Sequence, residues 1–188
     1  MSETEIGQPT KHDIVGFLAR LNGESPRSRI LLEAGLLEEL LRSAILRRLA
    51  TNKSSVELFG EQCSLGLVLL AKYAHSLGLI GNSEIDALKK FAKARNSIAH
   101  SWKADFTDSS LQKIARSIQF IVLKDEHEMQ PDQSCFARLD YLGAYLTELF
   151  FNRFLQSPST IYDGGVFAKS LHVDPSTGSR EMKVETAA

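Results

Sequence analysis

The chain has 188 residues, of which 43% are hydrophobic and 24% charged, and its formal net charge at pH 7 is -1. This length and composition are typical of one globular domain with a tail, long enough to bury a core. A charge so close to zero argues against bulk electrostatic capture of nucleic acid, which usually needs a basic domain. No apolar run approaches the ~20 residues of a membrane span, so the sequence predicts no membrane segment.

The cysteines and the N-terminus indicate a cytoplasmic protein. Residues 1–9 are polar and acidic, without the basic start and apolar middle of a secretory signal. Cys63 and Cys135 lie far apart and have no partners at metal-ligand spacing, as expected in a reducing compartment. The sequence predicts no metal and no cofactor.

Helical periodicity runs through nearly every long segment, and no alternating run suggests a sheet. The predicted helices cover residues 11–21, 27–49, 64–77, 83–100, 109–123 and 134–155. Loops are expected at 52–55 and 125–133, with a short buried turn at Leu58–Gly60. In the second predicted helix, Glu38 precedes Arg42 by four residues, the order that favours an ion pair between neighbouring turns.

The sequence therefore predicts an all-α fold, a bundle of five to six helices over residues 11–157. A disordered N-terminus, residues 1–10, is expected before the bundle. An irregular and partly disordered tail, residues 158–188, is expected after it because of its glycines, prolines and low hydrophobicity.

The segment with the most chemical content lies near the end of the fourth predicted helix. It places Arg95, Asn96 and His100 within six residues, with Asn96 and His100 on one face of the helix. An arginine can form two hydrogen bonds to phosphate oxygens, and a histidine can transfer a proton near neutral pH. The pattern suits the binding and cleavage of an RNA phosphate.

Lys89, Lys90 and Lys93 lead into this segment and Trp102 follows it, so these four are candidate RNA contacts. The alternative for the lysines is a solvated helix face. The alternative for the arginine, asparagine and histidine is structural, because such side chains can satisfy the exposed carbonyls at a helix end. His75 is a further candidate to support the site, since its helix is expected to pack beside the fourth helix.

The segment Arg95–His100 fits the R-x-x-x-x-H signature of HEPN domains, small helical bundles found in many bacterial toxins and defence proteins. A wider stretch of about 75 residues resembles the mannitol operon repressor (MltR-like) family, itself a helical bundle of this kind. The segments that carry this resemblance are Leu36–Leu41, Leu58–Gly60, Ala71–Ile80 and Ala94–Ser101.

The resemblance implies two functions. HEPN ribonucleases of toxin, defence or RNA-processing type cleave RNA without a metal, usually as dimers. In that case Arg95 would stabilise the scissile phosphate, Asn96 would orient the phosphate or the imidazole, and His100 would transfer a proton, leaving a cyclic phosphate. A homodimer through the faces of the second to fourth helices is expected, with RNA as substrate and an antitoxin or regulatory protein as partner. The mannitol repressor relatives imply instead a non-enzymatic transcriptional regulator that acts through protein–protein contacts.

Overall fold

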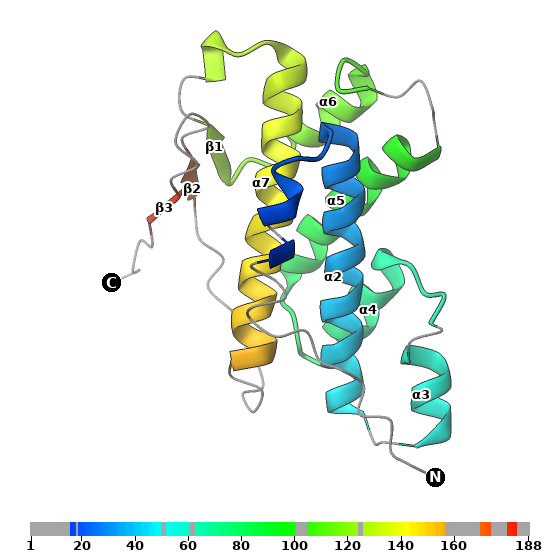
Figure 1. Ribbon diagram of the computed structural model, residues 1–188. Coiled ribbons are helices and arrows are strands. Elements are labelled where there is room, and N and C mark those ends of the chain that lie inside the picture. The colour runs from blue at the N-terminus through cyan, green and yellow to red at the C-terminus, as the bar shows by residue number, and fades with distance from the viewer. Residues whose placement is uncertain are drawn as a thin grey trace.

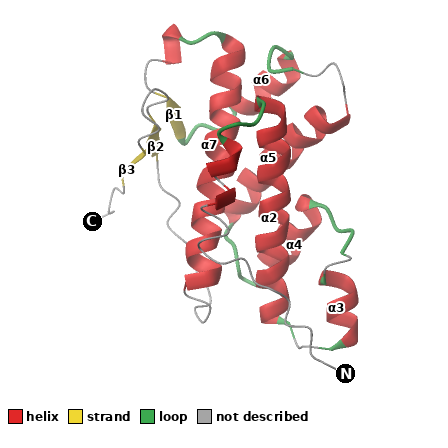
Figure 2. Cartoon of the chain, viewed as in Figure 1, coloured by secondary structure: helices red, strands yellow, loops and turns green. Residues whose placement is uncertain are grey.

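The computed structural model describes residues 16–17, 19–49, 52–60, 63–100, 105–123, 126–156, 170–173 and 180–183. Within them the chain is a bundle of α-helices with one small sheet at its side (Figures 1 and 2). The helices are α2 (Pro26–Arg48), α3 (Lys53–Phe59), α4 (Leu67–Ser76), α5 (Asn82–His100), α6 (Ser109–Arg116), α7 (Pro131–Phe151), the short 3-10 helix η1 (Glu126–Glu128) and the π-helix η2 (Asn152–Gln156). The predicted helical bundle is confirmed.

Helices α2 and α7 lie side by side at the centre of the bundle (Figure 1). Helix α2 begins where the Ser25 side chain accepts a hydrogen bond of 3.2 Å from the Ser28 amide, and Pro26 occupies its first turn. It packs against α7, α4 and α5 through a buried apolar face. The residues of that face are Ile30, Ala34, Leu37, Leu40, Leu41, Ala44 and Ile45.

Helices α4 and α5 form an antiparallel pair. The chain reverses at Gly78, whose φ of +69° is a left-handed conformation that glycine adopts without strain. Near this turn, Nε2 of His75 and Oδ1 of Asn82 are hydrogen-bonded at 2.9 Å. The start of α4 therefore lies beside the end of α5, where the predicted site residues are.

Residues 52–55 were predicted as a loop and Leu58–Gly60 as a turn, and this prediction is wrong. Asn52 caps α3, because its Oδ1 accepts a hydrogen bond of 2.9 Å from the Ser55 amide. Phe59 anchors the other end of α3 by packing edge-on against Tyr73 of α4, with ring centroids 5.1 Å apart. Packing against a distant helix thus stabilises a helix too short to form alone.

The predicted helix 109–123 is also wrong in its second half, because α6 ends at Arg116. The hydroxyl of Ser117 donates to the Ile114 carbonyl at 2.6 Å, and the chain then enters β1 (Ile121–Leu123). Strand β1 pairs in parallel with β2 (Ser170–Val173), which pairs antiparallel with β3 (Arg180–Lys183). These two strands lie in the segment predicted as an irregular tail, so the sheet was not predicted.

Across the residues that the structure describes, no helix combines the length and the apolar character needed to cross a membrane.

Candidate functional site

The last three turns of α5 carry the predicted site, and buried residues fix which way each side chain points. Phe91, Ala94 and Ile98 are at most 1% exposed and face the core at a spacing of three and four residues. Ile98 lies inside the Arg95–His100 segment itself. Because Ile98 points into the core, residues on the opposite side of this helical segment point toward the surface.

The three predicted catalytic residues lie around this exposed surface. Asn96 and His100 are both exposed and share one side of α5, since they are four residues apart on a continuous helix. Arg95 lies at one side of this exposed face of α5, and its side chain is 32% exposed. Its Nη1 donates a hydrogen bond of 3.0 Å to Oδ1 of Asn96. The structure therefore brings the arginine and the amide together, with the imidazole one turn further on.

Glu38 of α2 is a fourth member of this group, which sequence reasoning missed. Its Oε1 lies 3.6 Å from Nη2 of Arg95 and accepts a hydrogen bond of 3.0 Å from the Leu67 amide at the start of α4. The predicted pair of Glu38 with Arg42 is wrong, because Arg42 pairs with Glu39 and donates to the Gly60 carbonyl. Packing of α2 against α4 and α5 directs Glu38 toward Arg95, and spacing within α2 could not reveal this.

A pocket of about 260 Å³ lies between α4 and α5 at this point. Arg95 and Asn96 form its polar side, and the first turn of α4 forms the other. Its lining residues are Gly66, Leu67, Val68, Leu69, Ala92, Arg95 and Asn96. His100 is not among them, so the imidazole lies outside the pocket, further along α5.

The three candidate lysines differ in their surroundings. Lys89 pairs with Asp86 at 3.3 Å on the exposed side of α5, and Lys93 is also exposed. Lys90 points the other way and donates a hydrogen bond of 2.7 Å to the Ser117 carbonyl after α6. Trp102 lies outside the described residues. Two of the lysines thus share the side of α5 that carries Asn96 and His100.

His75 does not support the site as expected. It packs near the start of α5 through its hydrogen bond to Asn82, whereas Arg95 and His100 lie near the other end of that helix. The antiparallel arrangement of α4 and α5 explains the difference, because it places Leu67, and not His75, beside Arg95.

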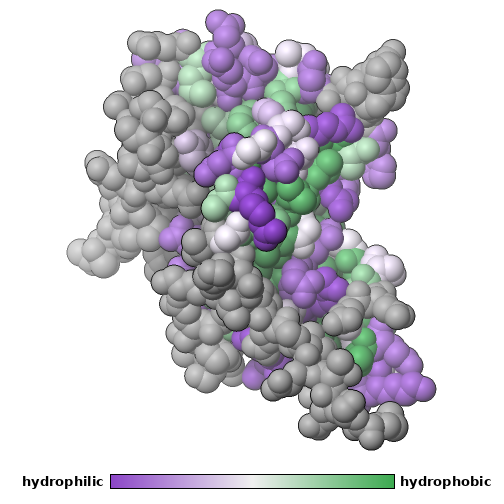
Figure 3. Space-filling model, viewed as in Figure 1, coloured by the Kyte–Doolittle hydropathy of each residue, from purple (hydrophilic) through white to green (hydrophobic). Residues whose placement is uncertain are grey.

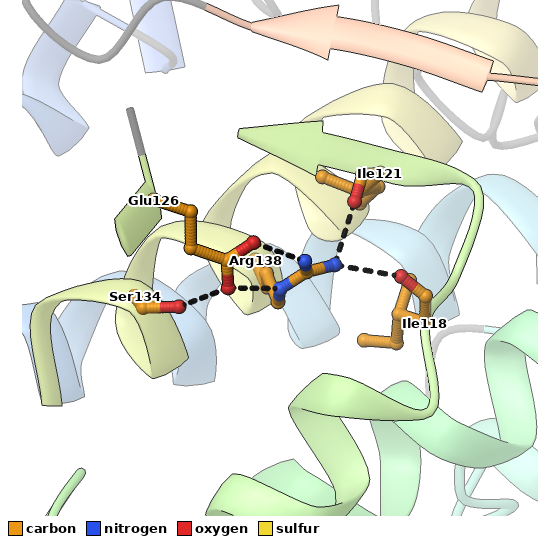
Figure 4. A network of polar contacts seen from close by, with 5 residues as sticks. All are labelled: Ile118, Ile121, Glu126, Ser134 and Arg138. Atoms are coloured by element: carbon orange, nitrogen blue, oxygen red, sulfur yellow. Dashed lines mark hydrogen bonds and ion pairs between the residues drawn. The ribbon is translucent and has the colours of Figure 1, made fainter. Parts of the chain in front are cut away.

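A second polar cluster surrounds Arg138 of α7 (Figure 4). Nε of Arg138 donates to Glu126 at 2.8 Å, and Nη1 donates to the carbonyls of Ile118 and Ile121 at 3.0 and 2.6 Å. The hydroxyl of Ser134 also donates to Glu126. The hydrogen bonds from Arg138 hold the pKa of the Glu126 carboxyl below its usual range. This cluster fixes α7 to the segment that leads into β1, and its role is structural.

The thiol of Cys135 lies beside this cluster, in a smaller pocket of about 160 Å³ that Arg116 and Met129 also line. Burial raises the pKa of Cys135 to about 12, which makes the thiol a poor nucleophile. Within the described part of the chain, no three His, Cys, Asp or Glu side chains gather closely enough to hold a metal ion.

Comparison of this chain with protein-family models, with curated proteins and with solved structures finds no match.

Proposed function

We propose that this chain is a metal-independent endoribonuclease of the HEPN type, active as a homodimer, in which Arg95, Asn96 and His100 act on the RNA phosphate. The observation that carries the proposal is the arrangement of polar side chains on α5. Lys89, Lys93, Asn96 and His100 follow one another at intervals of four, three and four residues, and all are exposed. They form one stripe along the helix, with Arg95 at its edge.

The stripe has the chemistry to follow an RNA strand. The lysines attract phosphates, and the amide and the imidazole can form hydrogen bonds to phosphate oxygens or to a ribose hydroxyl. With a chain charge of only -1, binding must rely on such a local concentration of positive groups. The affinity of the protein for RNA is therefore expected to fall as the salt concentration rises.

In this proposal the scissile phosphate lies above Ala99. Ala99 lies four residues after Arg95, three after Asn96 and directly before His100, so the three functional side chains surround it on the helix. Its side chain is exposed and small. A phosphate above Ala99 can reach the guanidinium from one side and the imidazole from the other.

The chemistry then follows from general principles. The 2′-oxygen of the preceding ribose attacks phosphorus, and the bond from phosphorus to the 5′-oxygen breaks. The products are a 2′,3′-cyclic phosphate and a 5′-hydroxyl. The attacking hydroxyl loses one proton and the leaving 5′-oxygen gains one, so no net proton is released. His100 performs one of these transfers, which typically contributes ~10²–10⁴-fold to the rate. Arg95 stabilises the charge that develops on the phosphate oxygens.

Exposed apolar side chains support a dimer through α2, α3 and α4. Among the described residues, the large hydrophobic side chains that are exposed all lie on these three helices, whereas the interface expected from the sequence involves residues 27–49, 64–77 and 83–100, which correspond to α2, α4 and α5. The exposed side chains are Leu32, Val56, Leu58, Leu69 and Tyr73. In Figure 3, hydrophobic residues reach the surface near the middle of the molecule, between hydrophilic neighbours. Leu69 also lines the Arg95 pocket, so an interface over α4 places a second subunit beside the site.

A non-enzymatic regulator that acts through protein contacts is the second candidate. The same exposed apolar side chains and the near-zero charge favour it. The two candidates differ in what His100 does, because a protein-binding surface on α2, α3 and α4 does not need an imidazole at the end of α5. Under the regulator hypothesis, His100→Ala leaves function unchanged or weakens the dimer.

The test is cleavage of total RNA in excess chelator by purified wild type, His100→Ala and His75→Ala. His75→Ala is the matched control, since it removes a histidine near the other end of α5. We expect cleavage by wild type and by His75→Ala, and its loss in His100→Ala with folding and sedimentation unchanged. Equal cleavage by all three proteins, or by none, contradicts the proposal.

A further inference from the structure

The carboxylate of Glu38 joins three helices at a single point. It belongs to α2, accepts the Leu67 amide of α4 at 3.0 Å, and lies 3.6 Å from the Arg95 guanidinium of α5. The Glu38 side chain is 21% exposed and that of Arg95 is 32% exposed, so both groups are partly withdrawn from solvent. The neighbouring Glu39 is different, because it pairs with Arg42 on the outside of the same helix.

The two contacts of Glu38 differ in kind. The bond from the Leu67 amide has ordinary hydrogen-bond length, and it comes from the first turn of α4, where negative charge is favoured. The distance to Arg95 is longer than a hydrogen bond, so this contact is electrostatic. The carboxylate is thus fixed to α4 and attracts the guanidinium without using up its N–H donors.

We infer that Glu38 is a positioning residue for Arg95, and this inference rests on the proposed ribonuclease function. The guanidinium is attracted by the Glu38 carboxylate and donates a hydrogen bond to the Asn96 amide oxygen, and together these two contacts hold it at the edge of the pocket. A guanidinium held in advance loses little freedom when it binds the charged transition state. Glu38 therefore contributes to cleavage although it does not touch the RNA.

The charge of Glu38 also has a cost for RNA binding. A carboxylate next to Arg95 reduces the positive potential that a phosphate meets before reaction. Removal of this charge should strengthen RNA binding and at the same time release the guanidinium from its productive orientation. A positioning role therefore predicts opposite effects on binding and on the chemical step, which simple damage to the fold does not produce.

Glu38→Gln is the variant that tests this, with Glu39→Gln as its matched control. The amide oxygen of glutamine can still accept the Leu67 N–H, so the fold is retained while the charge is lost. On a labelled oligonucleotide we expect Glu38→Gln to lower kcat by about ten- to a hundredfold, with KM unchanged or lower. Glu39→Gln should behave as wild type. A kcat for Glu38→Gln equal to or above that of wild type overturns the inference.

A second readout does not depend on activity. The Nε–Hε signal of Arg95 in NMR spectra, assigned by its absence in Arg95→Lys, reports how rigidly the guanidinium is held. We expect a rigid group in wild type and in Glu39→Gln and a mobile one in Glu38→Gln. Equal rigidity in all three overturns the positioning role, whatever the cleavage result. If the rigidity depends on Glu38 but wild type cleaves no RNA, the proposed function fails while the contact stands.

Discussion

Gly143 of α7 lies so close to Glu33 of α2 that a Cβ at this position would be 2.2 Å from the Glu33 carboxylate oxygen. The same Cβ would lie 2.9 Å from the ring of Phe91 on α5. Three helices of the bundle thus meet at a point where only glycine fits. Glu33 is 1% exposed, so its carboxylate cannot move out to make room.

Gly143→Ala is therefore expected to destabilise the protein by about 2 kcal/mol, the usual cost of overpacking a core. The control is Gly35→Ala, since Gly35 is also in a helix interior but a Cβ there meets nothing within 4 Å. Gly35→Ala should instead stabilise α2 by about 0.5–1 kcal/mol, because alanine loses less backbone entropy in a helix. Chemical denaturation of the two variants checks this. Equal effects of the two substitutions would show that α7 does not approach α2 and α5 so closely.

The Glu126–Arg138 cluster predicts acid sensitivity. The pKa of Glu126 is lowered from its ordinary value of 4.5, so the carboxylate stabilises the fold above that value, and the stabilisation is lost as pH falls through the lower, folded pKa. Glu126→Gln should destabilise the protein by about 2 kcal/mol at pH 7, because Arg138 loses its charged acceptor. Near pH 2 the difference between wild type and variant should shrink. Urea denaturation at both pH values measures it, and a difference that grows in acid would refute the linkage.

The two thiols should react at different rates. Cys135 is 2% exposed and has a pKa raised to about 12, whereas Cys63 is half-buried. Only the thiolate is alkylated, so iodoacetamide at pH 8 should label Cys63 quickly and Cys135 only after denaturation. Mass spectrometry of the alkylated peptides distinguishes the two. Rapid labelling of Cys135 in the folded protein would mean that the α7 side of the bundle opens.

Ala99→Leu tests the place assigned to the scissile phosphate. Leucine forms helices almost as well as alanine, and position 99 is exposed, so the thermal stability should change little. The larger side chain would fill the space between Arg95 and His100 and lower kcat/KM by about a hundredfold or more. Ser76→Leu, at another exposed helical position, provides the control. A fully active Ala99→Leu variant would exclude this placement of the phosphate.

The sequence predicts the features of this structure that depend on residues close together in the chain, and it does not predict those that depend on contacts with distant residues. Helix α5 and the position of Asn96 and His100 on one of its faces follow from helical spacing, and both were predicted. The end of α6 was not, because the segment after it becomes a strand by pairing with residues 170–173, far away in the chain. Such a pairing leaves no signal in the local pattern.

The candidate site shows the same difference between local spacing and long-range packing. The spacing of Arg95, Asn96 and His100 can be found in the sequence, but the partner of Arg95 cannot. Glu38 had an equally good candidate partner four residues along its own helix. Only the packing of α2 against α4 and α5 directs it to Arg95.

The measurement that tests the central claim most directly uses two oligonucleotides that differ by one oxygen. Once a cleavage position is mapped, one substrate carries ribose and the other 2′-deoxyribose at the nucleotide before it, and both are incubated with wild type in excess chelator. If the 2′-oxygen is the nucleophile, only the ribose substrate is cut, and its product ends in a 2′,3′-cyclic phosphate. Cleavage of the deoxy substrate, or complete loss of cleavage in chelator, would contradict a metal-independent reaction at Arg95 and His100.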